Sequence, residues 1–374
     1  MAVNLLAALD DERYGPSALA RAHEQAARAG YTLRRTDGAD ARLAAWIDLR
    51  FAPSWWSFEA NAGSAWVAER GAEIAGFAAF GARGLPFRWL RRWHTRGDVG
   101  IFGPYGVADE HRGGAIGDVL LTAALCGLRA MNYANALIPA VGGERLVAMY
   151  VRRTRAAVVD EFGYDDGARF RATILASGAG TNARNVIERA RAATLPLDVT
   201  ALVVNDPHAG ALAVARANGV DATAVTWNRA TEPRAAYDAR VIDAVARTEP
   251  QLVLLLGWMH LLPAAFVARF PHTINLHPSF LPLDPASDEV VAPDGTVLPA
   301  LRGARALRDT LALGLRWAGA TVHAITAATD RGAVLVRVPV PVGDTSTEDA
   351  LHEKLRPVEF ATVAAAIRRW GFER

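Results

Sequence analysis

The chain has 374 residues, of which 51% are hydrophobic and 21% are charged, and its formal net charge is +2. This length exceeds what one hydrophobic core usually organises, so we expect two domains of a soluble globular protein rather than a disordered or fibrous chain. The small net charge excludes the strongly basic surface that is typical of nucleic-acid-binding proteins.

Cys126 is the only cysteine, which excludes an internal disulfide and a thiolate zinc cluster, and we expect no metal site. The first residues, Met1–Gly15, lack a basic segment followed by a long apolar run, so they do not resemble a secretory signal. No stretch is both long enough and free enough of charges to span a membrane. We therefore expect a cytoplasmic enzyme that binds neither nucleic acid nor membranes, with its oligomeric state left open.

The pattern of the first half predicts a mixed arrangement of strands and helices. Asn4 to Gly30 has helical spacing and ends at a glycine, which predicts one or two leading helices. The elements expected after it are a strand at Tyr31–Arg35, a helix at Ala41–Phe51, a hairpin of strands at Ala65–Glu69 and Ile74–Phe80, a strand at Val99–Val107, an amphipathic helix from Ile116, a strand at Ala134–Val141 and a helix ending near Arg153. This order indicates a mixed α/β layer and not a doubly wound parallel sheet.

The pattern changes near Asp165–Arg171, so we expect domains at 1–168, with leading helices in 1–30, and at 169–374. Strands then alternate with helices, which predicts a parallel sheet. The expected elements are a strand in ATILASGAGTN, a helix at Ala183–Ala193, a strand at Val199–Val204, a helix at Ala209–Ala217, a strand at Ala222–Val225, a helix at Ala235–Thr248 and a strand at Leu252–Leu256.

A polar, acidic segment with two prolines, DPASDEVVAPDGTV at Asp284–Val297, interrupts the second half. A solvent-exposed loop is the simpler interpretation of this composition. Because the segment directly follows the most informative motif of the chain, a lid over a functional site is the alternative.

Two motifs of the second half carry chemistry. SGAGTN, Ser177–Asn182, lies between a strand and a helix, where free backbone N–H groups attract phosphate, although many such turns bind nothing. In TINLHPSFLP, Thr273–Pro282, Asn275 and His277 stand two residues apart on an apolar strand, so their side chains share one face. An amide donor beside an imidazole suits the oxyanion of acyl transfer. For an isolated pair, a purely structural role would be the simpler interpretation.

Four blocks in order, ILASGAGTN, LVLLLGWMHLLPAAFVARF, TINLHPSFLP and GATVHAITAATDRGAVLVRVPVPVGDT, resemble the 10-formyltetrahydrofolate-dependent formyltransferases related to glycinamide ribonucleotide transformylase. The resemblance runs from about Ala172 to Arg374 and implies a Rossmann-like domain that moves the formyl group of 10-formyltetrahydrofolate to an amine. It implies that Asn275 and His277 polarise the formyl oxygen. Asp330 would pair with the histidine and assist proton transfer.

The same resemblance implies a binding site for a small-molecule amine that carries a phosphate. Its residues would be Gly180, Thr181, Asn182, Arg356 and Glu359, with Pro357 marking a helix start near the last two. The folate pocket would be formed by Met259, His260, Leu262, Thr326 and Thr329.

The chain also departs from this family. His260 replaces a usual arginine, Phe360 follows Glu359 where histidine is usual, and the acidic segment replaces a histidine-containing loop. These departures leave the acceptor open between glycinamide ribonucleotide and another amine.

In the first half, the strand at Val99–Val107 and the turn and helix after it resemble the acyl-CoA site of the GNAT N-acetyltransferases, over about Tyr31–Asp165. The resemblance implies acetyl-CoA as a cofactor, with Tyr150 protonating its sulfur, and a buried structural tyrosine is the alternative for this position. Its pyrophosphate would lie against Val107, Arg112, Gly113, Gly114, Ala115 and Gly117, where Ala115 replaces a usual glycine. Glu69, Glu73 and Asp98 are equally placed as a general base.

The two motif sets together favour a bifunctional enzyme, in which the second domain formylates an amine and the first acylates an amine from acetyl-CoA. The alternative is a monofunctional formyltransferase with a non-catalytic GNAT domain, acting on glycinamide ribonucleotide in purine synthesis.

Overall fold

A computed structural model describes residues 1–164 and 167–374, and the chain divides into two compact units. Unit 1 consists of Met1–Phe51, Trp55–Asp166 and Phe372–Arg374, and unit 2 of Ala52–Ser54 and Gly167–Gly371. The border expected from the sequence begins at residues 165–166, which lie outside the described part. Among the described residues, no helix combines the length and the apolar character needed to cross a bilayer.

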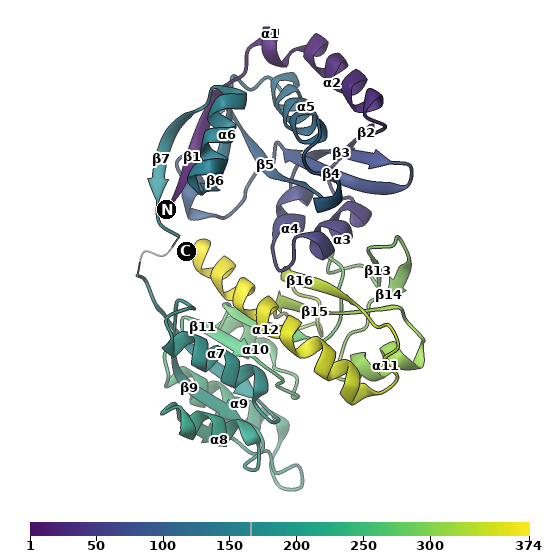
Figure 1. The fold of residues 1–374 in the computed structure, drawn as a ribbon. Helices are drawn as coiled ribbons and strands as arrows, with labels where there is room; N and C mark the ends of the chain where they lie inside the picture. The colour runs from purple at the N-terminus through teal and green to yellow at the C-terminus, as the bar shows by residue number, and fades with distance from the viewer. Residues whose placement is uncertain (165–166) are drawn as a thin grey trace. The chain divides into compact units, whose positions relative to one another are not determined.

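Unit 1 contains a seven-stranded mixed sheet in the order β2-β3-β4-β5-β6-β1-β7 (Figure 1). Its strands are β1 (Ala2–Ala8), β2 (Thr32–Asp37), β3 (Ser64–Arg70), β4 (Glu73–Phe80), β5 (Val99–Val107), β6 (Asn135–Gly142) and β7 (Ala157–Phe162). Its helices are α1 (Asp11–Tyr14), α2 (Pro16–Arg28), α3 (Ala41–Arg50), α4 (Trp56–Asn61), α5 (Ile116–Ala130) and α6 (Glu144–Thr154), with 3₁₀ turns η1 at Arg88–Leu90 and η2 at Asp109–His111.

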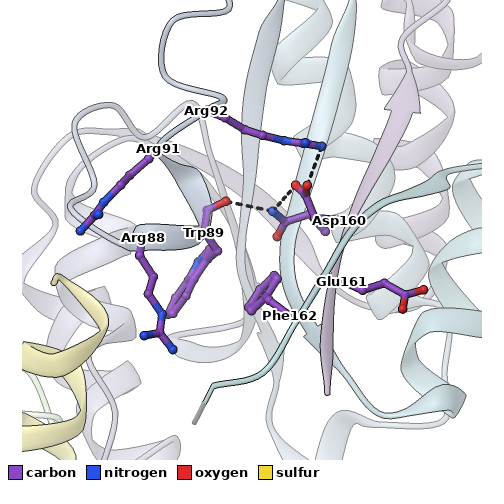
Figure 2. Close-up of a pocket in the computed structure, with 8 residues that line it drawn as sticks. Arg88, Trp89, Arg91, Arg92, Asp160, Glu161 and Phe162 are labelled. Carbon is purple, nitrogen blue, oxygen red and sulfur yellow. Dashed lines mark hydrogen bonds and ion pairs between the residues drawn. The ribbon is translucent and has the colours of Figure 1, made fainter. Parts of the chain in front are cut away.

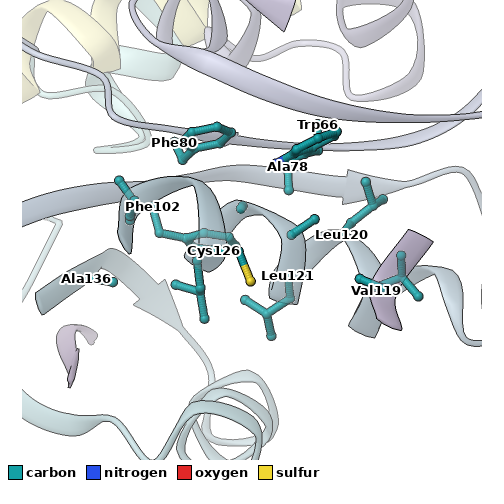
Figure 3. Packing of buried hydrophobic residues seen from close by; sticks show 14 of the residues in the cluster. Trp66, Ala78, Phe80, Phe102, Val119, Leu120, Leu121, Cys126 and Ala136 are labelled. Atoms are coloured by element: carbon teal, nitrogen blue, oxygen red, sulfur yellow. The ribbon is translucent and has the colours of Figure 1, made fainter. Parts of the chain in front are cut away.

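The two faces of this sheet are covered by different helices because strand side chains alternate. On β3, Trp66 and Ala68 belong to the cluster that contains the apolar side chains of α2 and α5, whereas Ala65 and Val67 belong to the cluster of α3. Figure 3 shows the first cluster, where Cys126 of α5 is buried among leucine, valine and phenylalanine side chains. The mixed sheet and most of the elements expected for the first half are confirmed.

The first strand of unit 1 was not expected. Ala2–Ala8 forms β1 rather than a leading helix, and only the residues after it, in α1 and α2, are helical. β1 runs antiparallel to both β6 and β7, so its backbone groups are paired on both sides. These long-range pairings override the helical spacing of the short apolar run.

Unit 2 contains a second seven-stranded sheet, in the order β10-β9-β8-β11-β12-β15-β16. Its strands are β8 (Phe170–Ala176), β9 (Leu197–Val204), β10 (Asp221–Ala224), β11 (Leu252–Leu255), β12 (Thr273–His277), β15 (Trp317–Ala324) and β16 (Val334–Pro341). Its helices are α7 (Thr181–Arg191), α8 (Gly210–Ala217), α9 (Arg234–Ala246), α10 (Ala264–Arg269), α11 (Ala306–Ala312) and α12 (Glu348–Phe372). The strands from β10 to β12 are parallel, as expected, whereas β15 and β16 pair antiparallel.

Two local expectations for unit 2 are corrected. Pro357 does not mark a helix start, because it lies inside α12, which begins at Glu348. The acidic segment, for which a solvent-exposed loop was the simpler interpretation, folds into a hairpin of β13 (Glu289–Val291) and β14 (Val297–Pro299), with Val290 and Leu298 buried.

Candidate functional site

Asn275 and His277 lie on β12, between parallel β11 and antiparallel β15, so the expected pair is held in the middle of the sheet. Asp330 lies in the turn after β15 and is only 12% exposed at its side chain. Asn275 Nδ2 is 3.3 Å from Asp330 Oδ1, and His277 Nδ1 is 3.5 Å from Asp330 Oδ2. The three residues singled out in the sequence therefore meet around one carboxylate.

A fourth side chain, His323 on β15, belongs to the same cluster. It is the cross-strand partner of Asn275, and its Nε2 lies 3.4 Å from Asp330 Oδ1 and 3.2 Å from Asn275 Nδ2. Sequence reasoning assigned His323 no role, although it stands in the quoted block GATVHAIT. Only the register between β12 and β15 reveals that it faces the pair.

Backbone carbonyls fix which nitrogen of each imidazole carries the proton. His277 Nε2 donates to the carbonyl of Leu301 at 2.8 Å, and His323 Nδ1 donates to that of Ala324 at 2.8 Å. The neutral ring of His277 therefore presents its unprotonated Nδ1 to Asp330. The two hydrogens of Asn275 Nδ2 are divided between Asp330 and His323.

The electrostatics of the cluster separate an ionised carboxylate from a neutral ring. Burial alone would raise the pKa of Asp330, but a hydrogen bond from His323 and the charge of His277, each present when the ring is protonated, act together with the Gly303 amide to outweigh it and hold that pKa well below its usual range. For His277, burial lowers the pKa and outweighs the opposing effect of Asp330. At neutral pH Asp330 is a buried anion, and His277 is uncharged.

A pocket of about 100 Å³ opens beside this cluster. It is lined by Asn275, His323 and Asp330 together with four of the residues expected to hold folate, which are His260, Leu262, Thr326 and Thr329. Met259 does not line it, since its side chain is 58% exposed and its N–H donates to Ser177. His277 also lies outside the lining. Trp258, which was not expected, contributes an apolar wall.

His260 is held inside an aromatic group. Its Nδ1 lies 2.8 Å from the hydroxyl of Tyr237, and its ring meets those of Trp227 and Trp258 edge-on. Burial lowers the pKa of His260, and the charge of Arg234 lowers it further. The side chain that replaces arginine here is thus uncharged at neutral pH.

The glycine-rich turn ends at Gly180, whose φ of +76° is a conformation that glycine adopts readily. α7 starts at Thr181 with no side chain capping its N–H groups. Asn182 Nδ2 donates to Glu359 Oε2 at 2.9 Å, and Glu359 is buried, which raises the pKa of its carboxyl. Within the described residues, Asn182 Oδ1 and Arg356 Nε are buried without a hydrogen-bond partner.

The residues expected to bind acetyl-CoA lie around the turn between β5 and α5. Gly113 and Gly114 have open space around them, whereas a Cβ built at Gly117 would lie 2.6 Å from the hydroxyl of Tyr105. The guanidinium of Arg112 is bound to Asp109 and to the carbonyl of Val107. β5 and β6 pair in parallel only over Val99–Ile101 with Asn135–Leu137, whereas β5 stays paired with β4 as far as Val107.

Tyr150 and Ala115 flank this region from two helices. Tyr150 of α6 is 6% exposed and contacts Phe102, and burial raises the pKa of its hydroxyl. Ala115 is the residue before α5 and offers no side-chain cap.

A larger cavity of about 360 Å³ in unit 1 lies between η1 and β7 (Figure 2). Three arginines line it, yet Arg88, Arg91 and Arg92 point in different directions, and Arg92 pairs with Asp160 at 2.5 Å. The buried amide of Asn4 also donates to Asp160 at 2.9 Å. These contacts fasten β7 to η1 and do not form a convergent anion site.

Comparison with known proteins places unit 2 in a family. The formyl transferase family matches residues 170–285 and 287–367. The chain is 34% identical over 199 residues to a phosphoribosylglycinamide formyltransferase of Mycobacterium tuberculosis, covering 53% of this chain and 83% of the relative. It is 30% identical over 189 residues to the Escherichia coli enzyme of the same name, covering 50% and 81%.

Among solved structures, glycinamide ribonucleotide transformylase 1 of Symbiobacterium toebii is 29% identical and aligns over 56% of this chain and 90% of its own, with a TM-score of 0.47. The family match spans more than half of the sequence and includes Asn275, His277 and Asp330. The chain belongs to the formyl transferase family.

Proposed function

We propose that unit 2 transfers a formyl group from 10-formyltetrahydrofolate to a phosphorylated amine of the glycinamide ribonucleotide type. The observation that carries this proposal is the grouping of an amide donor and two imidazoles around the ionised Asp330, at the wall of a pocket. The names of the bacterial relatives support the acceptor class.

The pocket fits one end of an extended formyl donor. Its volume of about 100 Å³ is smaller than that of a pocket which encloses a whole ligand, and its walls combine Leu255, Trp258 and Ile325 with a few polar groups. Leu261 lines the pocket and is 66% exposed, and Met259, two residues before it, is 58% exposed, so both would cover a further part of an apolar ligand. The reacting carbon would then lie near Asn275, His323 and Asp330, which line the same pocket.

In the proposed reaction the neutral amine attacks the formyl carbon, a C–N bond forms, and the carbonyl electron pair moves to oxygen. Asn275 Nδ2 would donate to this oxygen in place of one of its present bonds. The carbonyl then re-forms, the bond from carbon to the donor nitrogen breaks, and a proton moves from the amine to that nitrogen.

Asp330 is a weak base because its pKa is low, so we assign it an electrostatic role. It would stabilise the positive charge that develops on the attacking amine. It would also stabilise His277, which can take a proton at Nδ1 while Nε2 stays bound to Leu301. The imidazole, not the carboxylate, would then carry the proton.

We propose Gly180, Thr181 and Asn182 as the acceptor phosphate site. The uncapped start of the 11-residue α7 offers N–H groups, and Arg356 offers a guanidinium with a buried, unpaired Nε. Glu359 would bind polar groups of the acceptor through Asn182 and its own carboxyl.

The test follows release of tetrahydrofolate from 10-formyltetrahydrofolate with a panel of amines that includes glycinamide ribonucleotide. We expect formylation of a phosphorylated amine, and loss of most of the rate in His277→Ala but not in the control His208→Ala, whose histidine is exposed. No release with any amine, or equal rates in both variants, would refute the proposal.

We further propose that residues 1–168 form a GNAT-like domain that binds acetyl-CoA at the turn before α5 and acylates an amine. The open space at Gly113 and Gly114, the uncapped start of the 15-residue α5 and the short pairing of β5 with β6 support it. All three carboxylates considered as base face arginines: Glu69 pairs with Arg34 and Arg42, Asp98 with Arg96, and Glu73 with Arg50 at 3.9 Å. Glu73 has the longest of these contacts and the most exposed side chain.

Calorimetric titration of the full chain with acetyl-CoA tests this second proposal. We expect saturable binding that Gly117→Trp abolishes and that the control Gly97→Ala, at an open position outside the turn, retains. Absence of binding to the unaltered chain would leave the monofunctional formyltransferase as the function.

A further inference from the structure

Three consecutive residues, 301–303, together contact both His277 and Asp330. The carbonyl of Leu301 accepts the Nε2 hydrogen of His277 at 2.8 Å, Arg302 Nε donates to the carbonyl of Asp330 at 3.2 Å, and the Gly303 amide donates to Asp330 Oδ2 at 2.7 Å. The segment 301–303 therefore sets the orientation of the ring and of the carboxylate together.

This segment leaves the acidic hairpin directly, and the hairpin holds it through Arg302. Arg302 Nη1 contacts Asp288 at 3.1 Å, and Nη2 donates to the carbonyl of Ser287 at 2.7 Å. The Arg302 side chain is only 12% exposed, so each of its three nitrogens has a protein partner in a poorly hydrated place. A buried guanidinium with its donors satisfied is a rigid connector.

Asp288 joins the hairpin to the other side of Asp330 as well. Its carboxylate pairs with Arg331, which follows Asp330 in the chain, and Arg331 Nη1 also donates to the carbonyls of Pro285 and Ala286 at 3.1 and 3.2 Å. The residue after the catalytic aspartate and the segment that binds its carboxylate are thus tied to the same hairpin.

Asp330 needs such support because its backbone is in an unfavourable conformation. Its φ is +51°, in the left-handed region that residues with side chains rarely adopt. A turn of this kind persists only where its surroundings fix it. Arg302 and Gly303 supply two of the contacts that do so.

We propose that Arg302 is a positioning residue for formyl transfer and that the hairpin 284–299 holds it in place through Asp288. The proposal rests on the formyl transfer inferred above but concerns residues that touch neither the pocket nor the proposed substrates. It assigns a role to the acidic segment, for which the sequence alone allowed two interpretations, a loop or a lid.

The test compares Arg302→Met with the control Asp294→Asn, which alters the same hairpin at a residue paired with Arg316 rather than with Arg302. For Arg302→Met we expect kcat to fall about 10- to 100-fold, since small displacements of reacting groups cost this much, while KM for the formyl donor changes less than about 2-fold. The acid limb of the kcat profile should move to higher pH, because the charge of Arg302 lowers the pKa of His277, and without it this imidazole takes up a proton at a higher pH. The control should match the unaltered chain.

A readout without turnover separates this proposal from that of formyl transfer. Carbon-13 NMR of side-chain-labelled aspartate, assigned with Asp330→Asn, should show a higher pKa for Asp330 in Arg302→Met than in the unaltered chain. If this pKa rises but neither protein transfers formyl groups, positioning stands and the proposed function fails. An unchanged pKa and an unchanged kcat would overturn the positioning role. If Arg302→Met does not fold, Asp288→Asn replaces it, because the Asp288 side chain is 75% exposed. This variant should give a smaller rise in the pKa of Asp330 and a smaller fall in kcat. If neither quantity changes, the positioning role of Arg302 is overturned.

Discussion

Replacing Gly180 by alanine should destabilise unit 2 through two separable effects. Gly180 has a φ of +76°, and a Cβ built on it would lie 2.6 Å from Ala211 Cα in α8. Ordinary contacts between carbon atoms are about 3.5–4.0 Å, so the start of α8 would have to retreat by about 1 Å. The left-handed conformation costs about 1–2 kcal/mol for a residue with a side chain, and the overpacking costs about 1–3 kcal/mol. Together they predict a loss of about 2–5 kcal/mol in the free energy of unfolding.

Gly219→Ala is the matched control, because its φ is +63° but the space around it is open. It should lose only the conformational part, about 1–2 kcal/mol. Urea denaturation, monitored by hydrogen exchange in peptides of α7, reports the unfolding of unit 2 alone. If Gly180→Ala is no less stable than Gly219→Ala, the contact between a Cβ at position 180 and α8 does not lower the free energy of unfolding, and the reasoning is refuted.

Three further predictions concern the site and the core. Asn275→Ala should lower the single-turnover rate of formyl transfer about 100-fold or more, as the loss of one oxyanion donor does elsewhere, and a loss below threefold would contradict its role. Because burial lowers the pKa of His277, the unfolded chain binds a proton at this histidine at a higher pH than the folded chain does. The urea midpoint of unit 2 should therefore decrease as the pH falls below about 6.5, and His277→Gln should flatten this pH dependence. Burial raises the pKa of the Cys126 thiol to about 11, so a disulfide reagent at pH 8 should modify it only in denaturant, and fast reaction of the native protein would contradict the packing of α5.

The alternation of strands and helices in unit 2 could be predicted because each element of a parallel sheet carries its own local pattern. The motif on β12 could be predicted for the same reason, since Asn275 and His277 are neighbours in sequence and share a face. β1 could not, because nothing within Ala2–Ala8 distinguishes a strand from a helix until β6 and β7 pair with it.

Contacts between distant segments explain what sequence reasoning missed at the site. His323 faces Asn275 only through the antiparallel register of β12 and β15. Arg302 reaches Asp330 across 28 positions of the chain, and no local signal marks a guanidinium that binds a carbonyl. Met259, which the resemblance assigned to the folate pocket, is 58% exposed and lies outside the pocket lining, so its role stays a prediction.

The place of β1 between β6 and β7 determines when unit 1 can fold. During synthesis β1 leaves the ribosome long before its two partner strands, since Ala2 pairs with Gly142 on one side and with Phe162 on the other. This side of the sheet therefore stays incomplete until nearly the whole unit has been made, and closing so long a loop slows folding. Nascent chains that stop before Phe162 would expose an apolar strand with unpaired backbone groups, which is the kind of segment that aggregates and that chaperones retain.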